Sequence, residues 1–267
     1  MINNISIMVV TLLIVLGLSF GSFINAFVWR IHEGIDWLKR RSECDYCHHV
    51  LSLIDLIPVL SWVMLKAKCR YCHKTLSWQY PLTEFVTAGL FIISYVYWPF
   101  SLQGLGLFQF VCWLVFMVGF IGLTIYDLKW RELPNKIVYF LIGLSFVQLL
   151  VVSIVGSDIK HLLGGFIGAA VVAGIFYLIF HISDAKWIGG GDVKLGVCLG
   201  FLVGGPINAV LLIFIASLAG TILALPLLVR YKTMNIHIPF GPFLMLAVIV
   251  VFFIGGDITS WYKHLII

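Results

Sequence analysis

Long apolar runs separated by short polar segments make up most of the chain. The runs lie at residues 5–28, 82–100, 107–126, 137–155, 161–181, 207–229 and 239–256, with a shorter run at 193–205. A helix needs roughly 20 apolar residues to cross the hydrocarbon core of a bilayer, which is about 30 Å thick. The pattern predicts an all-α polytopic membrane protein with about eight transmembrane helices, if the short run is counted as one.

The composition agrees with this fold class. Hydrophobic residues make up 61% of the 267 residues and charged residues only 11%, whereas charged residues are usually about 25% of a soluble domain. An ordinary soluble domain is therefore excluded. No basic residue precedes the first apolar run and no small-residue cleavage site follows it, so we expect a retained first helix rather than a signal peptide.

Lys and Arg residues gather in four of the polar segments. Fifteen of the 17 lie at residues 30–80, 127–136, 182–194 and 230–238, and Lys160 and Lys263 lie elsewhere. The positive-inside rule makes those four segments cytoplasmic and the N-terminus external, in a multi-pass protein of the cytoplasmic (inner) membrane. The net charge of +5 then reflects loops that lie against the lipid bilayer, so no nucleic-acid partner is expected.

The longest polar segment follows the first apolar run and divides the chain in two. Residues 1–100 contain the first helix, this polar segment and the second helix, whereas residues 101–267 are mostly apolar. We therefore predict two domains with these boundaries. The first carries a small cytoplasmic module, and the second is a membrane bundle.

Four cysteines in the polar segment have the spacing of a metal site. Cys44, Cys47, Cys69 and Cys72 form two C-x2-C pairs separated by 21 residues. Two such pairs surround one tetrahedral Zn²⁺ ion, and four thiolates leave no open position for a substrate. Because thiols in the cytoplasm stay reduced, disulfides are disfavoured. The spacing predicts a structural zinc ion.

A histidine follows each cysteine pair, which leaves a second interpretation open. The segments CDYCH at 44–48 and CRYCH at 69–73 also fit the attachment pattern of c-type haem. Covalent haem attachment in bacteria is expected outside the cytoplasmic membrane, whereas the basic residues place this segment inside. Zinc is therefore favoured, and a visible absorption spectrum distinguishes the two.

Two aspartates stand at the ends of apolar runs that the topology places on the cytoplasmic side. Asp127 ends the run VGFIGLTIYD, and Asp192 follows three glycines. Ionisable residues at the rim of a membrane are costly and are functional candidates by default. Two carboxylates close together share one proton, and such a pair activates water for amide hydrolysis. The aspartates therefore predict a hydrolytic site if they meet in space.

The residues around Asp192 support this interpretation. Gly189 and Gly191 lack a Cβ atom and therefore permit close approach of a substrate strand. Lys194 can stabilise developing charge or extend its amino group to the membrane interface, and the second role is favoured. The run at 193–205 is short for a membrane span, as expected of a helix that lines a wet cavity.

Other roles for the two aspartates stay open. Asp127 can pair with Lys129 or Arg131, and Asp192 can cap the following helix. The two acidic groups can also relay protons in a transporter.

Four segments in order form a set of motifs. They are GSFINAFVWRI at 21–31, the four-cysteine region at 42–84 with DLIPVLSW and YPLTE, Asp127 followed by LPN at 133–135, and GGGDVK at 189–194. The set resembles the type IV prepilin peptidases, a family of membrane aspartyl proteases with a GxGD signature. The resemblance covers about residues 17–215.

The resemblance implies an enzyme with a defined substrate class. A member of this family cleaves the basic leader from prepilins and pseudopilins at the cytoplasmic face of the membrane. Asp127 and Asp192 would be the catalytic pair, which makes residues 101–267 the peptidase domain.

The resemblance also implies a second activity in residues 1–100, the transfer of a methyl group from S-adenosylmethionine to the new N-terminal amine. Asn25, Arg30 and Glu84 are polar, near the membrane surface and in family motifs, so they are candidates for this step. Asp45 stands where the family often has proline, with little expected consequence for zinc. A peptidase without methyl transfer, in which the zinc module is purely structural, remains the alternative.

Overall fold

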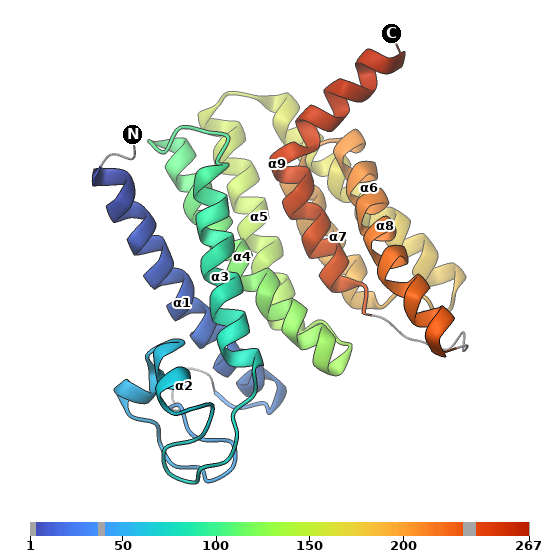
Figure 1. The fold of residues 1–267 in the computed structure, drawn as a ribbon. Coiled ribbons are helices and arrows are strands. Elements are labelled where there is room, and N and C mark those ends of the chain that lie inside the picture. The colour runs from blue at the N-terminus through green and yellow to red at the C-terminus, as the bar shows by residue number, and fades with distance from the viewer. Residues whose placement is uncertain (1–3, 37–40, 232–238, 267) are drawn as a thin grey trace. The chain divides into compact units, whose positions relative to one another are not determined.

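The computed structural model describes residues 4–36, 41–231 and 239–266, and within these ranges every element longer than an isolated β-bridge is a helix. The elements are α1 (Asn4–His32), η1 (Leu53–Leu56), α2 (Leu60–Met64), α3 (Gln79–Val96), α4 (Leu105–Trp130), α5 (Asn135–Val155), α6 (Ile159–Ile182), α7 (Gly190–Val203), α8 (Pro206–Tyr231) and α9 (Gly241–Ile266) (Figure 1). Each of the eight predicted apolar runs forms a helix. The predicted all-α class is confirmed.

Six helices in the described ranges are long and apolar enough to cross a membrane, namely α1, α4, α5, α6, α8 and α9. Helices α3 and α7 are the other two that match apolar runs. Helix α3 carries the buried polar side chains Thr83, Glu84 and Thr87. Helix α7 has 14 residues, which extend only about 21 Å. The predicted count of about eight therefore includes the six long apolar helices, the more polar helix α3 and the shorter helix α7.

The structure divides into two compact units. Unit 1 comprises residues 1–98 and 113–122, and unit 2 comprises residues 99–112 and 123–267. In unit 1, α1 and α3 lie side by side, and residues 41–78 between them form a small lobe, here called the cysteine module (Figure 1). The middle of α4 thus belongs to unit 1 and its two ends to unit 2.

Small residues allow α1 and α3 to pack closely. A Cβ atom on Gly17 would lie 2.5 Å from the Cα atom of Ala88, and one on Gly21 would lie 2.6 Å from the Cα atom of Glu84. Real Cβ atoms do not approach a backbone so closely, so only glycine fits at these two positions. In membrane proteins such small residues bring helix backbones together where lipid provides no hydrophobic driving force.

The middle of α4 completes the core of unit 1. The indole nitrogen of Trp113 donates a hydrogen bond to Ser94 Oγ of α3 at 3.0 Å, and Trp113 is fully buried. A Cβ atom on Gly122 would lie 2.9 Å from the Cδ1 atom of Ile24 in α1. Unit 1 is therefore a packed assembly of α1, α3 and one segment of α4.

Helix α7 lies at the centre of unit 2. It packs against α5, α6, α8 and α9. Leu195, Cys198 and Leu199 on it are fully buried. A Cβ atom on Gly168 of α6 would lie 2.6 Å from the carbonyl oxygen of Gly200, so the two helices approach closely. A helix surrounded by protein need not span the bilayer itself, and its neighbours hold its first turn in place.

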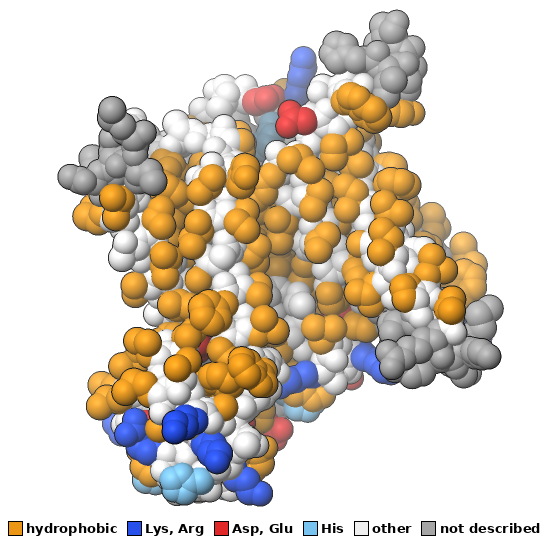
Figure 2. Space-filling view, viewed as in Figure 1, with side chains coloured by type: hydrophobic (Ala, Val, Ile, Leu, Met, Phe, Trp, Pro, Cys, Tyr) orange, Lys and Arg blue, Asp and Glu red, His pale blue; other side chains and the backbone are white. Residues whose placement is uncertain are grey.

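The exposed helix faces are apolar. On α8 the exposed large side chains recur every three or four residues at Ile207, Val210, Phe214, Leu218, Ile222, Leu225 and Val229. That spacing marks one face of a helix. Figure 2 shows hydrophobic side chains over the helices, whereas Lys, Arg and His side chains gather on the cysteine module. Faces of this kind fit a bilayer and would favour aggregation in water.

Candidate active site and metal centre

Asp127 lies in the last turn of α4 and is 6% exposed. Its carboxylate Oδ2 accepts a hydrogen bond of 3.0 Å from the backbone N–H of Gly241, the first residue of α9. A Cβ atom on residue 241 would lie 2.6 Å from the same oxygen, so any larger residue there would displace the carboxylate. The positive end of the α9 dipole therefore faces the Asp127 carboxylate and favours its charged form.

Asp192 lies in the first turn of α7, where Gly189 is the N-cap residue, and its side chain is half-buried. Burial, and to a smaller extent the charge of Asp127, raise the pKa of the Asp192 carboxyl to about 7. The Gly189 backbone lowers the pKa slightly. The structure thus brings Asp127 and Asp192, which are 65 positions apart, within electrostatic reach.

The LPN segment packs on the first turn of α7. A Cβ atom on Gly191 would lie 2.8 Å from the Cβ atom of Leu133, so this glycine makes room for the segment that follows α4. Lys194 Nζ donates a hydrogen bond of 2.8 Å to Asn135 Oδ1 and lies 5.5 Å from the centre of the Tyr139 ring. Lys194 therefore has a partner in protein, a pairing that the sequence analysis did not identify. In the sequence, this pairing is marked only by the asparagine of the LPN motif, Asn135.

The four predicted zinc ligands lie together. The Sγ atoms of Cys44, Cys47, Cys69 and Cys72 all lie within 4.8 Å of one another, and none of these cysteines forms a disulfide. The Cys44 and Cys72 sulfurs are 3.8 Å apart. Tetrahedral zinc with Zn–S bonds of about 2.3 Å separates its sulfur ligands by about 3.8 Å. The cluster can therefore hold a metal ion, and its dimensions fit zinc.

The two C-x2-C turns are near copies of each other. His48 N–H donates to the Cys44 carbonyl at 2.9 Å, and His73 N–H donates to the Cys69 carbonyl at 3.0 Å. Both histidines have positive φ, 55° and 57°. An isolated antiparallel bridge flanks each turn. Residues 48 and 73 therefore close the two turns through their backbones, a role that does not depend on the histidine side chain.

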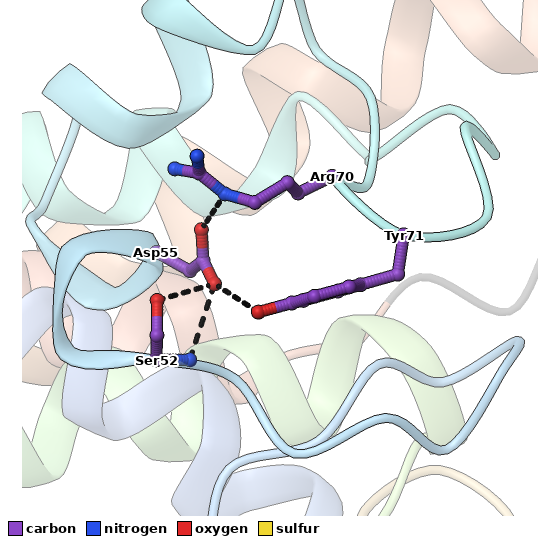
Figure 3. A network of polar contacts seen from close by, with 4 residues as sticks. All are labelled: Ser52, Asp55, Arg70 and Tyr71. Carbon is purple, nitrogen blue, oxygen red and sulfur yellow. Dashed lines mark hydrogen bonds and ion pairs between the residues drawn. The ribbon is translucent and has the colours of Figure 1, made fainter.

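A polar network joins the DLIP segment to the second cysteine turn (Figure 3). Asp55 Oδ1 accepts a hydrogen bond of 2.6 Å from Arg70 Nε, and Asp55 Oδ2 accepts hydrogen bonds from the Tyr71 hydroxyl at 3.2 Å and the Ser52 hydroxyl at 2.7 Å. Burial alone would raise the pKa of Asp55, but the Ser52 and Arg70 contacts lower it overall. Asp55 is therefore charged, and its contacts hold the module together.

The three N-terminal candidates are all buried. Asn25 is 6% exposed, Arg30 9% and Glu84 5%. Asn25 Oδ1 accepts hydrogen bonds from the side chains of Gln79 and Thr83 at 3.0 and 3.3 Å. The structure brings the three candidates together, because all of them line one cavity of unit 1.

The other contacts of these candidates reach the cysteine module. Arg30 Nη2 donates to Ser42 Oγ at 3.3 Å. Glu84 Oε2 accepts a hydrogen bond of 2.7 Å from the backbone N–H of Val59. The polar ends of α1 and α3 thereby bind the segments on both sides of the first cysteine turn.

Two family models match the chain. The model described as the bacterial peptidase A24 N-terminal domain matches residues 15–98. The model described as the type IV leader peptidase family matches residues 114–225. The first match contains the cysteine module with the buried residues of α1 and α3, and the second contains both aspartates.

Curated relatives match over almost the whole chain. A prepilin leader peptidase/N-methyltransferase of Xanthomonas campestris is 30% identical, over 92% of this chain and 92% of that relative. One of Bacillus subtilis is 29% identical, over 94% of this chain and 97% of the relative. A type 4 prepilin-like proteins leader peptide-processing enzyme of Escherichia coli is 29% identical, over 86% and 88%. No solved structure matches. The chain therefore belongs to the type IV leader peptidase family.

Proposed function

We propose that the chain is a membrane aspartyl endopeptidase that removes the leader from type IV prepilins and pseudopilins and then methylates the new N-terminal residue. The observation that carries the proposal is the convergence of Asp127 and Asp192 from separate helices of unit 2. The names of the relatives, which pair leader peptidase with N-methyltransferase, support the substrate class and the second activity.

The two aspartates divide the work of hydrolysis. Asp127 carries the charge, because the Gly241 N–H and the α9 dipole stabilise its anion. It takes a proton from water, and the resulting hydroxide attacks the scissile carbonyl. Asp192 holds the shared proton and donates it to the carbonyl oxygen as the tetrahedral intermediate forms. Asp127 then returns its proton to the leaving amine, while Asp192 takes back a proton from a hydroxyl of the intermediate as the C–N bond breaks. Both aspartates thereby recover their starting protonation states, and no covalent enzyme intermediate is needed.

The proposal includes a structural zinc ion and a methyl donor. Cys44, Cys47, Cys69 and Cys72 would hold zinc, since their sulfur positions fit a closed tetrahedral site. S-Adenosylmethionine supplies an electrophilic methyl group when bound. Asn25, Arg30 and Glu84 are the candidates for holding it, and they lie in the same unit as the cysteine module.

The membrane topology belongs to the same proposal. Fifteen of the 17 Lys and Arg residues lie in the four loops predicted to be cytoplasmic. In the proposed topology the N-terminus lies outside the inner membrane, and the cysteine module and both aspartates lie at its cytoplasmic face. A basic leader would meet the anionic Asp127 carboxylate and an anionic membrane surface there.

The test uses the full chain in lipid nanodiscs with a purified prepilin and S-adenosylmethionine. We expect a product that lacks the leader and carries one additional methyl group on its N-terminus, as measured by intact mass and peptide mapping. A shortened but unmethylated product would establish the peptidase-only alternative. An unprocessed prepilin would refute the proposal, and proton flux in proteoliposomes would then test the transporter alternative.

Gly241→Ala is expected to lower kcat for leader cleavage by about 100-fold, because an added Cβ displaces the Asp127 carboxylate from its working position. KM should change little, since residue 241 is proposed to position a carboxylate rather than to bind the leader. Steady-state cleavage of a prepilin peptide measures both constants.

The matched control is Gly256→Ala on the same helix, where nothing lies within 4 Å of an added Cβ. This variant should cleave at the parental rate. Equal rates for the Gly241→Ala and Gly256→Ala enzymes would contradict the role given to the Gly241 contact.

A further inference from the structure

The cysteine module exposes a group of large apolar side chains. On α2, Leu60, Val63 and Met64 stand at positions i, i+3 and i+4, which lie on one face of a helix, and all three are exposed. Leu53 and Ile54 of η1, which packs against α2, are exposed as well. These five residues are here called the apolar patch. A contiguous apolar surface of this kind marks a site of interaction with a protein or a membrane.

Helix α2 is held beside the apolar part of α3. The N–H of Val59, the N-cap residue of α2, donates a hydrogen bond of 2.7 Å to Glu84 Oε2. Glu84 belongs to the apolar run that begins at residue 82, and its neighbours Leu82 and Phe85 are exposed on α3. The start of α2 therefore lies level with side chains of α3 that suit lipid.

A pair of tryptophans joins the module to α3 at the same level. The ring of Trp62, on the other side of α2 from the apolar patch, lies 4.3 Å from the ring of Trp78, measured between centroids. Trp78 is exposed and directly precedes α3. Tryptophan is enriched where the hydrocarbon of a membrane meets water. The pair therefore marks the membrane interface and leaves the apolar patch facing outward beside it.

Basic side chains accompany the apolar patch. Residues 41–78 contain five Lys and Arg against three Asp and Glu, and one of these acids, Asp55, pairs with Arg70. Lys66 and Lys68 follow α2 almost directly and are exposed. Figure 2 shows hydrophobic side chains on the part of the module next to the helices, and Lys and Arg side chains further out. An anionic leaflet has the same order, with hydrocarbon inside and negative headgroups outside.

We propose that the apolar patch inserts into the anionic lipid leaflet that borders the cysteine module, and that Lys66 and Lys68 bind the phosphate groups of this leaflet. Lipid is the partner that fits, because the patch is held level with the apolar part of α3 and the charges beside it are positive. Amphipathic segments of this kind enter the boundary between headgroups and acyl chains by about 5–10 Å. The module is then fixed both by α1 and α3 and by the bilayer.

Site-specific crosslinking tests the contact in the full chain, reconstituted in nanodiscs that contain phosphatidylglycerol. Met64→p-benzoylphenylalanine places a photoreactive group in the apolar patch. Tyr46→p-benzoylphenylalanine is the matched control, because Tyr46 is also exposed but lies in the first cysteine turn. After irradiation, mass spectrometry should find a lipid adduct at residue 64 and none at residue 46. Absence of a lipid adduct at residue 64 would overturn the proposal, whether that residue reacts with a second copy of the chain, with added prepilin or with nothing.

Hydroxyl-radical footprinting tests the same contact in the parental protein, without any substitution. Met64 is 76% exposed and Tyr46 60% exposed in the structure, so without lipid Met64 would be oxidised at least as fast as Tyr46. In the nanodiscs we expect Met64 to be oxidised at least about tenfold more slowly than Tyr46, because burial in an apolar phase excludes water from the side chain. Equal rates would overturn the proposal.

The lipid composition tests the role of the lysines. Nanodiscs of phosphatidylcholine alone should protect Met64 less than those with phosphatidylglycerol, since Lys66 and Lys68 lose their anionic partners. Equal protection in the two lipids would overturn the role given to these lysines. Neither measurement depends on leader cleavage or methyl transfer, so the result is independent of the proposed function.

Discussion

Asp127→Asn and Asp192→Asn are each expected to reduce leader cleavage by about 1,000-fold or more. Each aspartate has its own task in the proposed reaction. Loss of the Asp127 anion leaves no base for water, and loss of the Asp192 proton leaves the developing oxyanion without an acid. Asn keeps the size and shape of the side chain, so the effect should fall on kcat. Cleavage of a purified prepilin by each variant separately measures it.

Asp184→Asn provides the matched control for this experiment. Asp184 is exposed and lies in the turn between α6 and α7, with φ 48°, a conformation that Asn tolerates well. The control should cleave at the parental rate, and all three variants should keep the binding of the methyl donor. Retained cleavage in both active-site variants would eliminate the aspartyl protease mechanism.

Cys69→Ala is expected to abolish metal binding and to unfold the cysteine module. Apparent binding free energies of structural zinc sites are about 10–16 kcal/mol, and they are also folding free energies. Cys69 is buried, and its sulfur is one of the four in the cluster. Metal content should fall from one ion per chain to none, and hydrogen exchange within residues 41–78 should accelerate.

Cys112→Ala is the control for the metal experiment. Cys112 is buried in α4 and lies outside the cluster, so the variant should retain its metal and its protected module. A Cys69→Ala protein with full metal content would contradict the assignment of the ligands. A haem absorption band in the parental protein would instead support the c-type haem alternative.

The helices were predictable because each apolar run is longer than the strands and turns of soluble proteins. The run at 161–181, for example, became α6 at Ile159–Ile182. The predicted bounds were less accurate where a helix extends beyond its apolar run into polar residues. Helix α9 continues from the apolar run through the polar residues after Asp257. Helix α3 begins at Gln79, before its apolar run, because its polar first turns pack on α1.

The candidate site was predictable only as far as local motifs reach. The GxGD glycines and the trailing LPN marked both aspartates, and the cysteine spacing marked the metal ligands. The Gly241 contact joins residues 114 positions apart. The contact between the Val59 N–H and Glu84 likewise depends on packing that no short motif records. Contacts between distant segments follow from the tertiary fold, so one sequence could not reveal them.

Helix α4 contributes to both units, so it decides what happens if the chain is divided in two. Its middle fills the core of unit 1 through Trp113 and Gly122, while Asp127 at its end belongs to unit 2. If the polypeptide ended after Trp98, Ser94 and Ile24 would lose the α4 residues that pack on them. A polypeptide cut at that boundary would therefore expose part of the core of unit 1.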